Sequence, residues 1–309
     1  MSAPITVVGS INIDLVFCTP RMPAVGETIT GNGFHQVQGG KGANQAVAAA
    51  RLGGEVRFVG AVGRDDFGTS ALVSMRAEGI DTGAVATVDR PSGVAGIFVA
   101  EGGANSIVIA PGANDAVSPE HVECAAPVIT SASYLVCQLE TPLASVTRAV
   151  ALAHAAGVRV VLNAAPAQPL DDALLAQIDY LIVNETEAAQ MSGIAVTDAP
   201  SALAAAQALR ARGAGTVLVT MGAAGVQVCG ASVQQFLPAF QVKVVDTTAA
   251  GDTFVGAFTV ALATGYALAE AADFAQAAAA IAVTRMGAQT SIPARDEVLD
   301  VLNQRGKAA

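Results

Sequence analysis

The stretch ANQAVAAARLGGEVRFVGAV, residues 43–62, joins a helix to a strand and decides the fold class. Its first half, Ala43–Leu52, is rich in Ala and other strong helix formers, and the Gly pair that follows ends the helix. Its second half, Val56–Val62, is a largely apolar run typical of a strand buried on both faces. Because Ile5–Val8 is a similar run ahead of the helix, the order strand–helix–strand predicts a parallel βαβ unit.

The same alternation continues along the chain. Further strands are expected at residues 134–138, 158–162, 180–183, 216–220 and 225–229, and further helices at residues 69–78, 143–156, 171–176, 201–212, 252–264 and 268–284. Residues 15–38 and 93–110 break this rhythm with short alternating stretches between Gly-rich turns. They predict a small β-layer separate from the main sheet, which is suited to act as a lid over a cleft.

Composition excludes several classes of protein. With 52% hydrophobic residues the 309-residue chain is far too apolar for intrinsic disorder. The 16 Lys and Arg against 26 Asp and Glu argue against a nucleic-acid partner. Residues 213–242 carry no charge, but their Gly and Gln content favours buried strands over a membrane span. Without a signal peptide or a CxxC pair, the chain is expected to be a cytoplasmic protein with reduced thiols.

Two loops near the N-terminus combine Gly with polar side chains. Residues 39–44, GGKGAN, would let the backbone approach a ligand closely, with Lys41 and Asn44 as directed contacts. The alternative is a Gly-rich loop with a solvated Lys. Asn12 and Asp14 follow the first strand, at the edge where open α/β sheets bind ligands. An amide and a carboxylate suit the hydroxyls of a polyol, and the alternative is an ordinary Asx turn.

The stretch VDTTAAGDTF, residues 245–254, leads small residues directly into a helix. Free N–H groups at that helix start can hold an anion, which the helix dipole also favours. Asp252 lies at the same place, where a carboxylate can accept a proton from a hydroxyl while the N–H groups stabilise a transferring phosphoryl group. A helix cap is the alternative, but a cap does not need the small residues before it, so we favour the chemical role.

Two further strand ends allow two interpretations each. Residues 184–187 place carboxylates where Mg²⁺ would be organised near phosphates, but Asn184 and Glu187 also have the spacing of a capping box. Residues 220–225, TMGAAG, form either a nucleotide-side loop or a plain hairpin turn.

In their order and spacing these segments resemble the ribokinase family of carbohydrate kinases over essentially the whole chain. The resemblance rests on VQGGKGANQAVAAARLGG at 37–54, VVDTTAAGDTFVGAF at 244–258, QLETP at 138–142, NETEA at 184–188 and AAAAIAVTRMGAQTSIP at 277–293. It implies one domain over residues 1–309, with a three-layer α/β/α core, a mainly parallel central sheet and a β-sheet lid. It also implies a homodimer in which the two lids clasp each other.

The resemblance further implies roles for single residues. The sugar would contact Asn12, Asp14, Gly40, Lys41, Gly42, Ala43, Asn44, Glu140 and Asp252, the last as catalytic base. The anion hole would consist of the amides of Ala249, Ala250 and Gly251. ATP would contact Asn184, Thr220, Met221, Gly222, Ala223, Ala224, Gly225, Gly251, Asp252 and Gln276, the last at a position where the family often has Asn. Mg²⁺ would be associated with Asn184 and Glu187. A monovalent cation, usually K⁺, would be bound by Asp246, Thr248, Ala282, Arg285, Gly287 and Ser291, mostly through backbone carbonyls.

The implied activity is ATP-dependent phosphorylation of D-ribose at O5, activated by the monovalent cation. Kinases of 2-deoxyribose, fructose or adenosine are the close alternatives. Asn12 favours a sugar with a 2-hydroxyl, because a deoxy sugar would leave its amide unpaired. The 4% aromatic content with no Trp disfavours a nucleoside. A non-catalytic sugar-binding protein on the same fold is a further alternative, which the presence of both Asp252 and the GGKGAN loop argues against.

Overall fold

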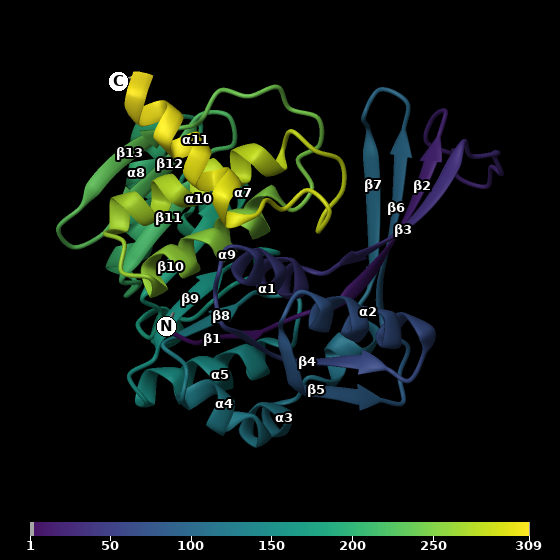
Figure 1. Ribbon diagram of the computed structural model, residues 1–309, viewed down its shortest axis with the longest axis horizontal. Coiled ribbons are helices and arrows are strands. Elements are labelled where there is room, and N and C mark those ends of the chain that lie inside the picture. Colours follow the sequence, from purple (N-terminus) through teal and green to yellow (C-terminus); the bar gives the residue numbers. More distant parts are fainter. Residues whose placement is uncertain (1–2, 309) are drawn as a thin grey trace.

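The computed structural model describes residues 3–308, which form two sheets and the helices around the larger one (Figure 1). The main sheet has nine strands in the order β13-β12-β11-β10-β9-β8-β1-β4-β5. Their bounds are β1 Ile5–Val8, β4 Val56–Gly63, β5 Asp81–Val88, β8 Tyr134–Cys137, β9 Arg159–Asn163, β10 Tyr180–Asn184, β11 Thr216–Thr220, β12 Gly225–Cys229 and β13 Gln234–Pro238. All neighbours from β11 to β5 pair in parallel, and β12 and β13 extend the sheet as antiparallel strands.

Helices cover both faces of this sheet. Their bounds are α1 Lys41–Arg51, α2 Asp66–Ala77, α3 Pro119–Cys124, α4 Ala126–Thr130, α5 Leu143–Ala155, α6 Asp172–Leu175, α7 Glu185–Ser192, α8 Ala199–Ala211, α9 Ala250–Ala263, α10 Leu268–Ala282 and α11 Arg295–Ala308. One buried cluster packs α1, α2 and α9 to α11 against the sheet, and a second packs α3 to α8 against the opposite face. The expected three-layer α/β/α core is confirmed.

Strand β11 illustrates why the central strands read as continuous apolar runs. Val217 and Val219 belong to the cluster beneath α3 to α8, whereas Leu218 between them belongs to the cluster on the other face. Successive side chains of a strand point to opposite faces, so a sheet with helices on both sides buries every position. Residues 213–242, uncharged and apolar, therefore contribute strands to a sheet. Among the described residues none of the helices combines the length and apolarity needed to cross a bilayer.

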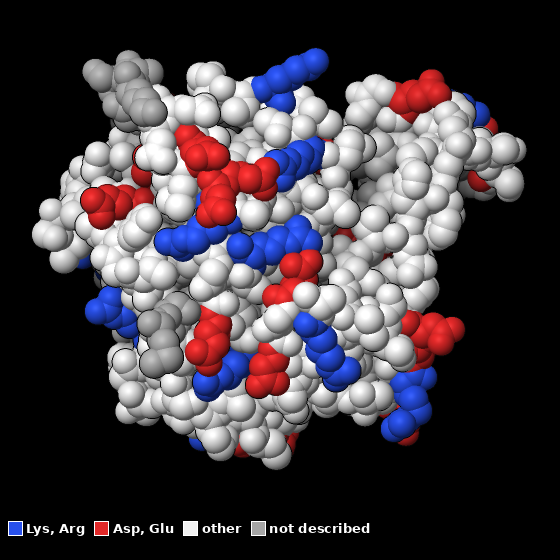
Figure 2. Space-filling model, viewed as in Figure 1, with Lys and Arg blue, Asp and Glu red and all other residues white. Residues whose placement is uncertain are grey.

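A second sheet of four strands projects from one end of the core (Figure 1). Its order is β3-β2-β6-β7, with bounds β2 Asn12–Thr19, β3 Gly33–Gly39, β6 Gly93–Ala100 and β7 Asn105–Ala110. The two insertions expected from the sequence thus pair with each other, through the parallel contact of β2 with β6. We call this sheet the lid. On the face shown in Figure 2 a recess separates the lid from the core. Acidic and basic side chains are interspersed over the core on this face.

Several elements are not expected from the sequence. These are β5, β13, α7, α11 and the short helical segments between residues 112 and 130. Strand β13 has no buried residue, and the apolar residues of α11 lie among many charged and polar side chains, so both carry a weaker apolar pattern than the central strands and helices.

Candidate active site

Asp252 lies in the first turn of α9 and is only 7% exposed. Two amides of α1 donate to its carboxylate: Asn44 Nδ2 to one oxygen at 3.0 Å and Gln45 Nε2 to the other at 2.9 Å. The structure therefore brings the GGKGAN loop and the predicted base together, although more than 200 residues separate them along the chain. Gln45 was not among the predicted site residues.

Asp14 enters the same site from the base of the lid. Its buried side chain fits because Gly39 stands beside it, where an added Cβ would lie 2.3 Å from both carboxylate oxygens. Burial first, and then the nearby carboxylates of Glu140 and Asp252, raise the pKa of Asp14 to about 6. A carboxylate so placed, with no hydrogen-bond partner among the described residues, is suited to accept from a ligand hydroxyl.

Asn12 begins β2, opposite Gly39 on one side and Gly93 on the other. Its Oδ1 accepts from Asn114 Nδ2 at 2.7 Å. Asn114 is itself fixed, because its Oδ1 accepts from the Ile11 N–H at 2.9 Å. The side-chain oxygen of Asn12 is therefore occupied, and its NH₂ group is left to donate to a ligand.

The start of α1 is held by groups from two other strand ends. Glu140 Oε2 accepts from the Lys41 N–H at 3.0 Å and from Ser10 Oγ at 2.6 Å. The Gly42 N–H donates to Ser10 Oγ at 3.2 Å, and the Ala43 N–H donates to the Ser10 carbonyl at 2.9 Å. The amides of Gly42 and Ala43 thus hold the loop, and the side chains of Lys41 and Asn44 remain as its polar groups at the site.

The side chain of Lys41 balances a cluster of carboxylates. Burial opposes its charged form, but the carboxylates of Asp252, Glu140 and Glu187 together raise the pKa of Lys41. An ammonium among these carboxylates can stabilise negative charge on a bound group.

The turn before α9 leaves N–H groups free. Ala249 adopts a left-handed conformation, φ 58° and ψ 13°, and is the one non-Gly residue with positive φ in the part of the chain that the structure describes. The Ala250 N–H donates to the Thr247 carbonyl at 3.2 Å, and the Thr253 N–H to the Ala249 carbonyl at 2.8 Å. Between residues 3 and 308 the amides of Ala249, Gly251 and Asp252 have no acceptor. These free N–H groups, which we call the nest, lie at the positive end of the helix, where an anion is favoured.

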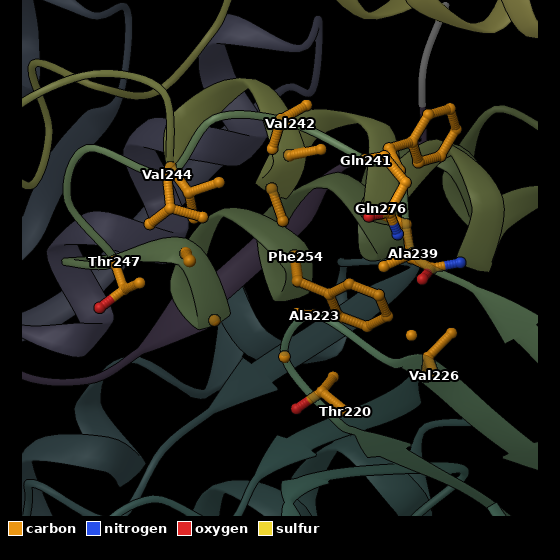
Figure 3. Close-up of a pocket in the computed structure, with 18 residues that line it drawn as sticks. Thr220, Ala223, Val226, Ala239, Gln241, Val242, Val244, Thr247, Phe254 and Gln276 are labelled. Carbon is orange, nitrogen blue, oxygen red and sulfur yellow. The ribbon is translucent and has the colours of Figure 1, made fainter.

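A cavity of about 330 Å³ opens beside this nest (Figure 3). Among the predicted nucleotide contacts Thr220, Gly222, Ala223, Gly225, Gly251 and Gln276 line it. Ala250, predicted as part of the anion hole, also lines it. The sequence did not point to the remaining lining residues, which are Val226, residues 239–242, Val244, Thr247, Phe254, Ala279, Ala280 and Val283. Ala279 and Ala280 follow Gln276 by three and four positions on α10, a spacing that could have indicated a shared face. Asn184, Met221, Ala224 and Asp252 lie outside the lining.

Gln276 is the polar exception in the wall formed by α10. It is 7% exposed, and its Nε2 is buried without a hydrogen-bond partner. Gln241 and Phe254 line the cavity together with it (Figure 3). A buried donor without a partner is costly unless a ligand supplies an acceptor, so the cavity suits a flat apolar group that carries ring acceptors.

The sequence as a whole matches the family described as pfkB family carbohydrate kinase over residues 2–295. The chain belongs to this family. It is 46% identical to the ribokinase of Haemophilus influenzae over 303 residues, which covers 98% of this chain and 99% of the relative. A deoxyribokinase of Salmonella typhimurium is 37% identical over 97% of this chain and 98% of the relative. A solved structure of Arabidopsis thaliana ribokinase complexed with ribose and ATP superposes with a TM-score of 0.92 at 33% identity, covering 98% of this chain and 99% of that one.

In this pfkB-family chain the Asn184–Glu187 segment is a capping box. Asn184 Oδ1 accepts from the Glu187 N–H at 2.8 Å, and Glu187 Oε2 accepts from the Asn184 N–H at 2.9 Å. Burial raises the pKa of Glu187, whose carboxylate is also near Lys41 and Asp252. Capping leaves the second oxygen of Glu187 as the group at this position that suits hydrated Mg²⁺.

The predicted ligands of the monovalent cation lie on two segments that meet. The Gly287 N–H donates to Asp246 Oδ2 at 2.8 Å, and the Thr248 N–H and hydroxyl donate to Asp246 Oδ1 at 2.9 Å and 2.6 Å. Although burial opposes it, these hydrogen bonds lower the pKa of Asp246, which is half-buried. Ser291 is buried, and its hydroxyl donates to the Ala288 carbonyl. The Ala282 carbonyl accepts from the Arg285 N–H. The atoms that these residues would present to a cation are carboxylate, hydroxyl and carbonyl oxygens, which suit K⁺ or a similar hard cation.

Proposed function

We propose that this chain catalyses the ATP-dependent phosphorylation of D-ribose at O5, giving ribose 5-phosphate and ADP. Support comes from its similarity to ribokinases over nearly the whole chain. The observation that carries the proposal is the place of Asp252, whose buried carboxylate lies between the polar groups at the lid base and the free N–H groups at the start of α9.

The sugar is proposed to bind beneath the lid. Asp14 accepts from hydroxyls and Asn12 donates to them, because Asn114 already occupies the side-chain oxygen of Asn12. Lys41 and the free oxygen of Glu140 complete the polar surround. The ribose then presents its 5-hydroxyl to Asp252, which bonds to Asn44 on the same side of the site.

The proposed chemical step is an in-line displacement at the γ-phosphorus. The 5-hydroxyl gives its proton to the Asp252 carboxylate as its oxygen forms a bond to phosphorus. The bond from phosphorus to the oxygen bridging to the β-phosphate breaks, and ADP leaves with that electron pair. The amides of Ala249 and Gly251 and the Lys41 ammonium stabilise the charge on the transferring group. Closure of the lid excludes water, which would otherwise compete as acceptor.

The nucleotide is proposed to occupy the cavity beside α10, with its base near Gln276 and its phosphates directed toward the nest. Glu187 would associate with the Mg²⁺ of the nucleotide through its second oxygen. The segments around Asp246 and Gly287 would hold K⁺. When bound, these cations would add positive charge next to the phosphates, beside that of Lys41.

Phosphorylation of 2-deoxyribose is the second candidate, because deoxyribokinases are among the relatives. The NH₂ of Asn12 distinguishes the two, since a sugar without the 2-hydroxyl leaves this donor unpaired. We expect ribose to be preferred. Equal values of kcat/KM for the two sugars would remove Asn12 from this role.

Asp252→Asn tests the proposal. The amide keeps the shape of the carboxylate but cannot accept the proton, so kcat on ribose should fall by a factor on the order of 10³ or more, while ribose binding measured by calorimetry stays within about threefold. A coupled assay for ADP across ribose, 2-deoxyribose, fructose and adenosine identifies the acceptor. A variant that turns over ribose as the parent does would refute the role of Asp252.

We further propose that two copies associate through their lids. Support comes from β7, where Ile107, Val108 and Ile109 are exposed to 54%, 70% and 46%. A row of apolar side chains on an outer strand is typical of an interaction surface.

A further inference from the structure

We infer that Gln45 is a positioning residue that fixes the orientation of the Asp252 carboxylate, a role that rests on the proposed function of Asp252 as base. Gln45 lies on α1, is 1% exposed and has its side-chain amide among other buried polar groups. Its Nε2 donates to Asp252 Oδ1 at 2.9 Å and to Asn163 Oδ1 at 3.0 Å.

The direction of the Gln45 amide is set by its neighbours. Gln45 Oε1 accepts from Gln138 Nε2 at 2.7 Å, so the NH₂ end faces Asp252 and Asn163. Asn163 is fixed in turn, because its Nδ2 donates to the Ile182 carbonyl at 3.1 Å and its oxygen therefore points to Gln45. Both N–H bonds of Gln45 are thus aimed before any ligand binds.

The other oxygen of Asp252 is held in the same manner. Asn44 Nδ2 donates to Asp252 Oδ2, and Asn44 Oδ1 accepts from Gln289 Nε2 at 3.2 Å. Each carboxylate oxygen therefore receives one N–H from an amide whose own oxygen is anchored. Because each oxygen accepts one of these hydrogen bonds, the carboxylate cannot rotate about its Cβ–Cγ bond. Its remaining lone pairs therefore keep one direction toward the proposed substrate.

Of the two residues that donate to Asp252, Gln45 is the one that is not itself proposed to contact ribose or ATP. Asn44 also belongs to the GGKGAN loop, so its replacement would affect the sugar directly. Removing the Gln45 N–H leaves Asp252 Oδ1 buried without a donor and lets the carboxylate rotate away from the 5-hydroxyl. Misplacement by about 1 Å costs a reaction of this kind about 100-fold.

Two variants test this role. Gln45→Met keeps the length of the side chain and removes the donor. Gln45→Glu places a carboxyl that donates only while it is protonated. Its ionisation is governed by Asp252 and by the other charged groups around the site, Asp14, Lys41, Glu140 and Glu187. Gln227→Met is the matched control, because Gln227 is also buried but lies on β12 and bonds to a backbone carbonyl.

For Gln45→Met we expect kcat on ribose to fall about 100-fold, with the KM for ribose changed less than about threefold. The activity of Gln45→Glu relative to the parent should rise as the pH is lowered from about 8 to about 6, whereas the relative activity of Gln45→Met stays flat. Gln227→Met should keep the parental kcat. If kcat of Gln45→Met stays within threefold of the parent, or if the two Gln45 variants share one flat profile, the role is refuted.

Crystal structures of the parent and of Gln45→Met distinguish a failure of this inference from a failure of the proposed function. A parent enzyme that phosphorylates none of the sugars refutes the proposed function itself. In that case the Asp252 side chain decides the role of Gln45. We expect the carboxylate to turn in Gln45→Met, and an unchanged carboxylate in that variant would overturn the inference.

Discussion

Gly256→Ala tests how closely α1 must lie against α9. On α9, Gly256 follows Asp252 by one turn and faces the backbone of α1. An added Cβ would lie 2.6 Å from the Ala48 Cβ, 2.6 Å from the Gln45 carbonyl oxygen and 2.9 Å from the Ala49 nitrogen. None of these atoms can move by a change of rotamer, so the helices themselves must separate.

The size of the effect follows from these distances. Ordinary contacts of a Cβ begin near 3.4 Å, so the two helices must part by roughly 1 Å. Overpacking of this kind costs about 1–3 kcal/mol of folding free energy. The same displacement draws the amides of Asn44 and Gln45 away from Asp252, so kcat should fall about 10- to 100-fold. Urea unfolding measures the first effect and steady-state kinetics with ribose the second.

Gly251→Ala is the control for stability. Gly251 lies on the same helix, and an added Cβ there meets no atom within 4 Å. Ala is the better helix former, so this variant should be at least as stable as the parent. If Gly256→Ala were as stable and as active as the parent, the close crossing of α1 and α9 would not be what positions Asp252.

Three further predictions concern Asp14, Ala249 and the lid. The pKa of Asp14 in the folded state, about 6, lies above its ordinary value of 3.8. The free energy of unfolding therefore falls as the pH rises from about 4 to 6. Asp14→Asn should remove this fall, so that urea unfolding at pH 7.5 gives a free energy of unfolding up to about 3 kcal/mol above that of the parent. The same variant should no longer bind ribose. Ala249→Gly relieves a left-handed Ala and should raise Tm by about 2 °C in calorimetry, whereas a lower Tm would contradict the strain argument. Val108→Lys should convert a dimer to a monomer in light scattering, and a dimeric variant would exclude β7 from the interface.

The order of elements could be predicted because it depends on local patterns. Apolar runs such as Val56–Val62 and the Gly-terminated helix before them report burial and chain reversal within a few residues. The lid was predicted for the same reason, since its strands alternate between Gly-rich turns. Strand β13 and helix α11 were missed because they carry weaker apolar patterns, and the rest of the fold determines where they pack.

The polar groups of the candidate site were predicted less completely. The sequence pointed to Lys41 and Asp252 because each lies beside Gly or small residues at the start of a helix, and to Asp14 because it follows the first strand. It did not point to Gln45, whose position within an Ala-rich helix resembles any other polar site. The role of Gln45 depends on a contact with Asp252 across 207 residues of sequence, and on where Gln138 and Asn163 lie.

The sequence by itself determined the α/β class, the lid insertions and the loops that carry chemistry, because propensity, periodicity and turn formation act over short stretches of chain. Tertiary structure alone decided that Asn184 and Glu187 cap each other, that Asn114 occupies the oxygen of Asn12, and that a set of buried amides orients Asp252. These outcomes depend on the order of strands in the sheet and on the distance at which helices cross. Both result from the packing of the whole core, to which every segment contributes and which no single segment encodes.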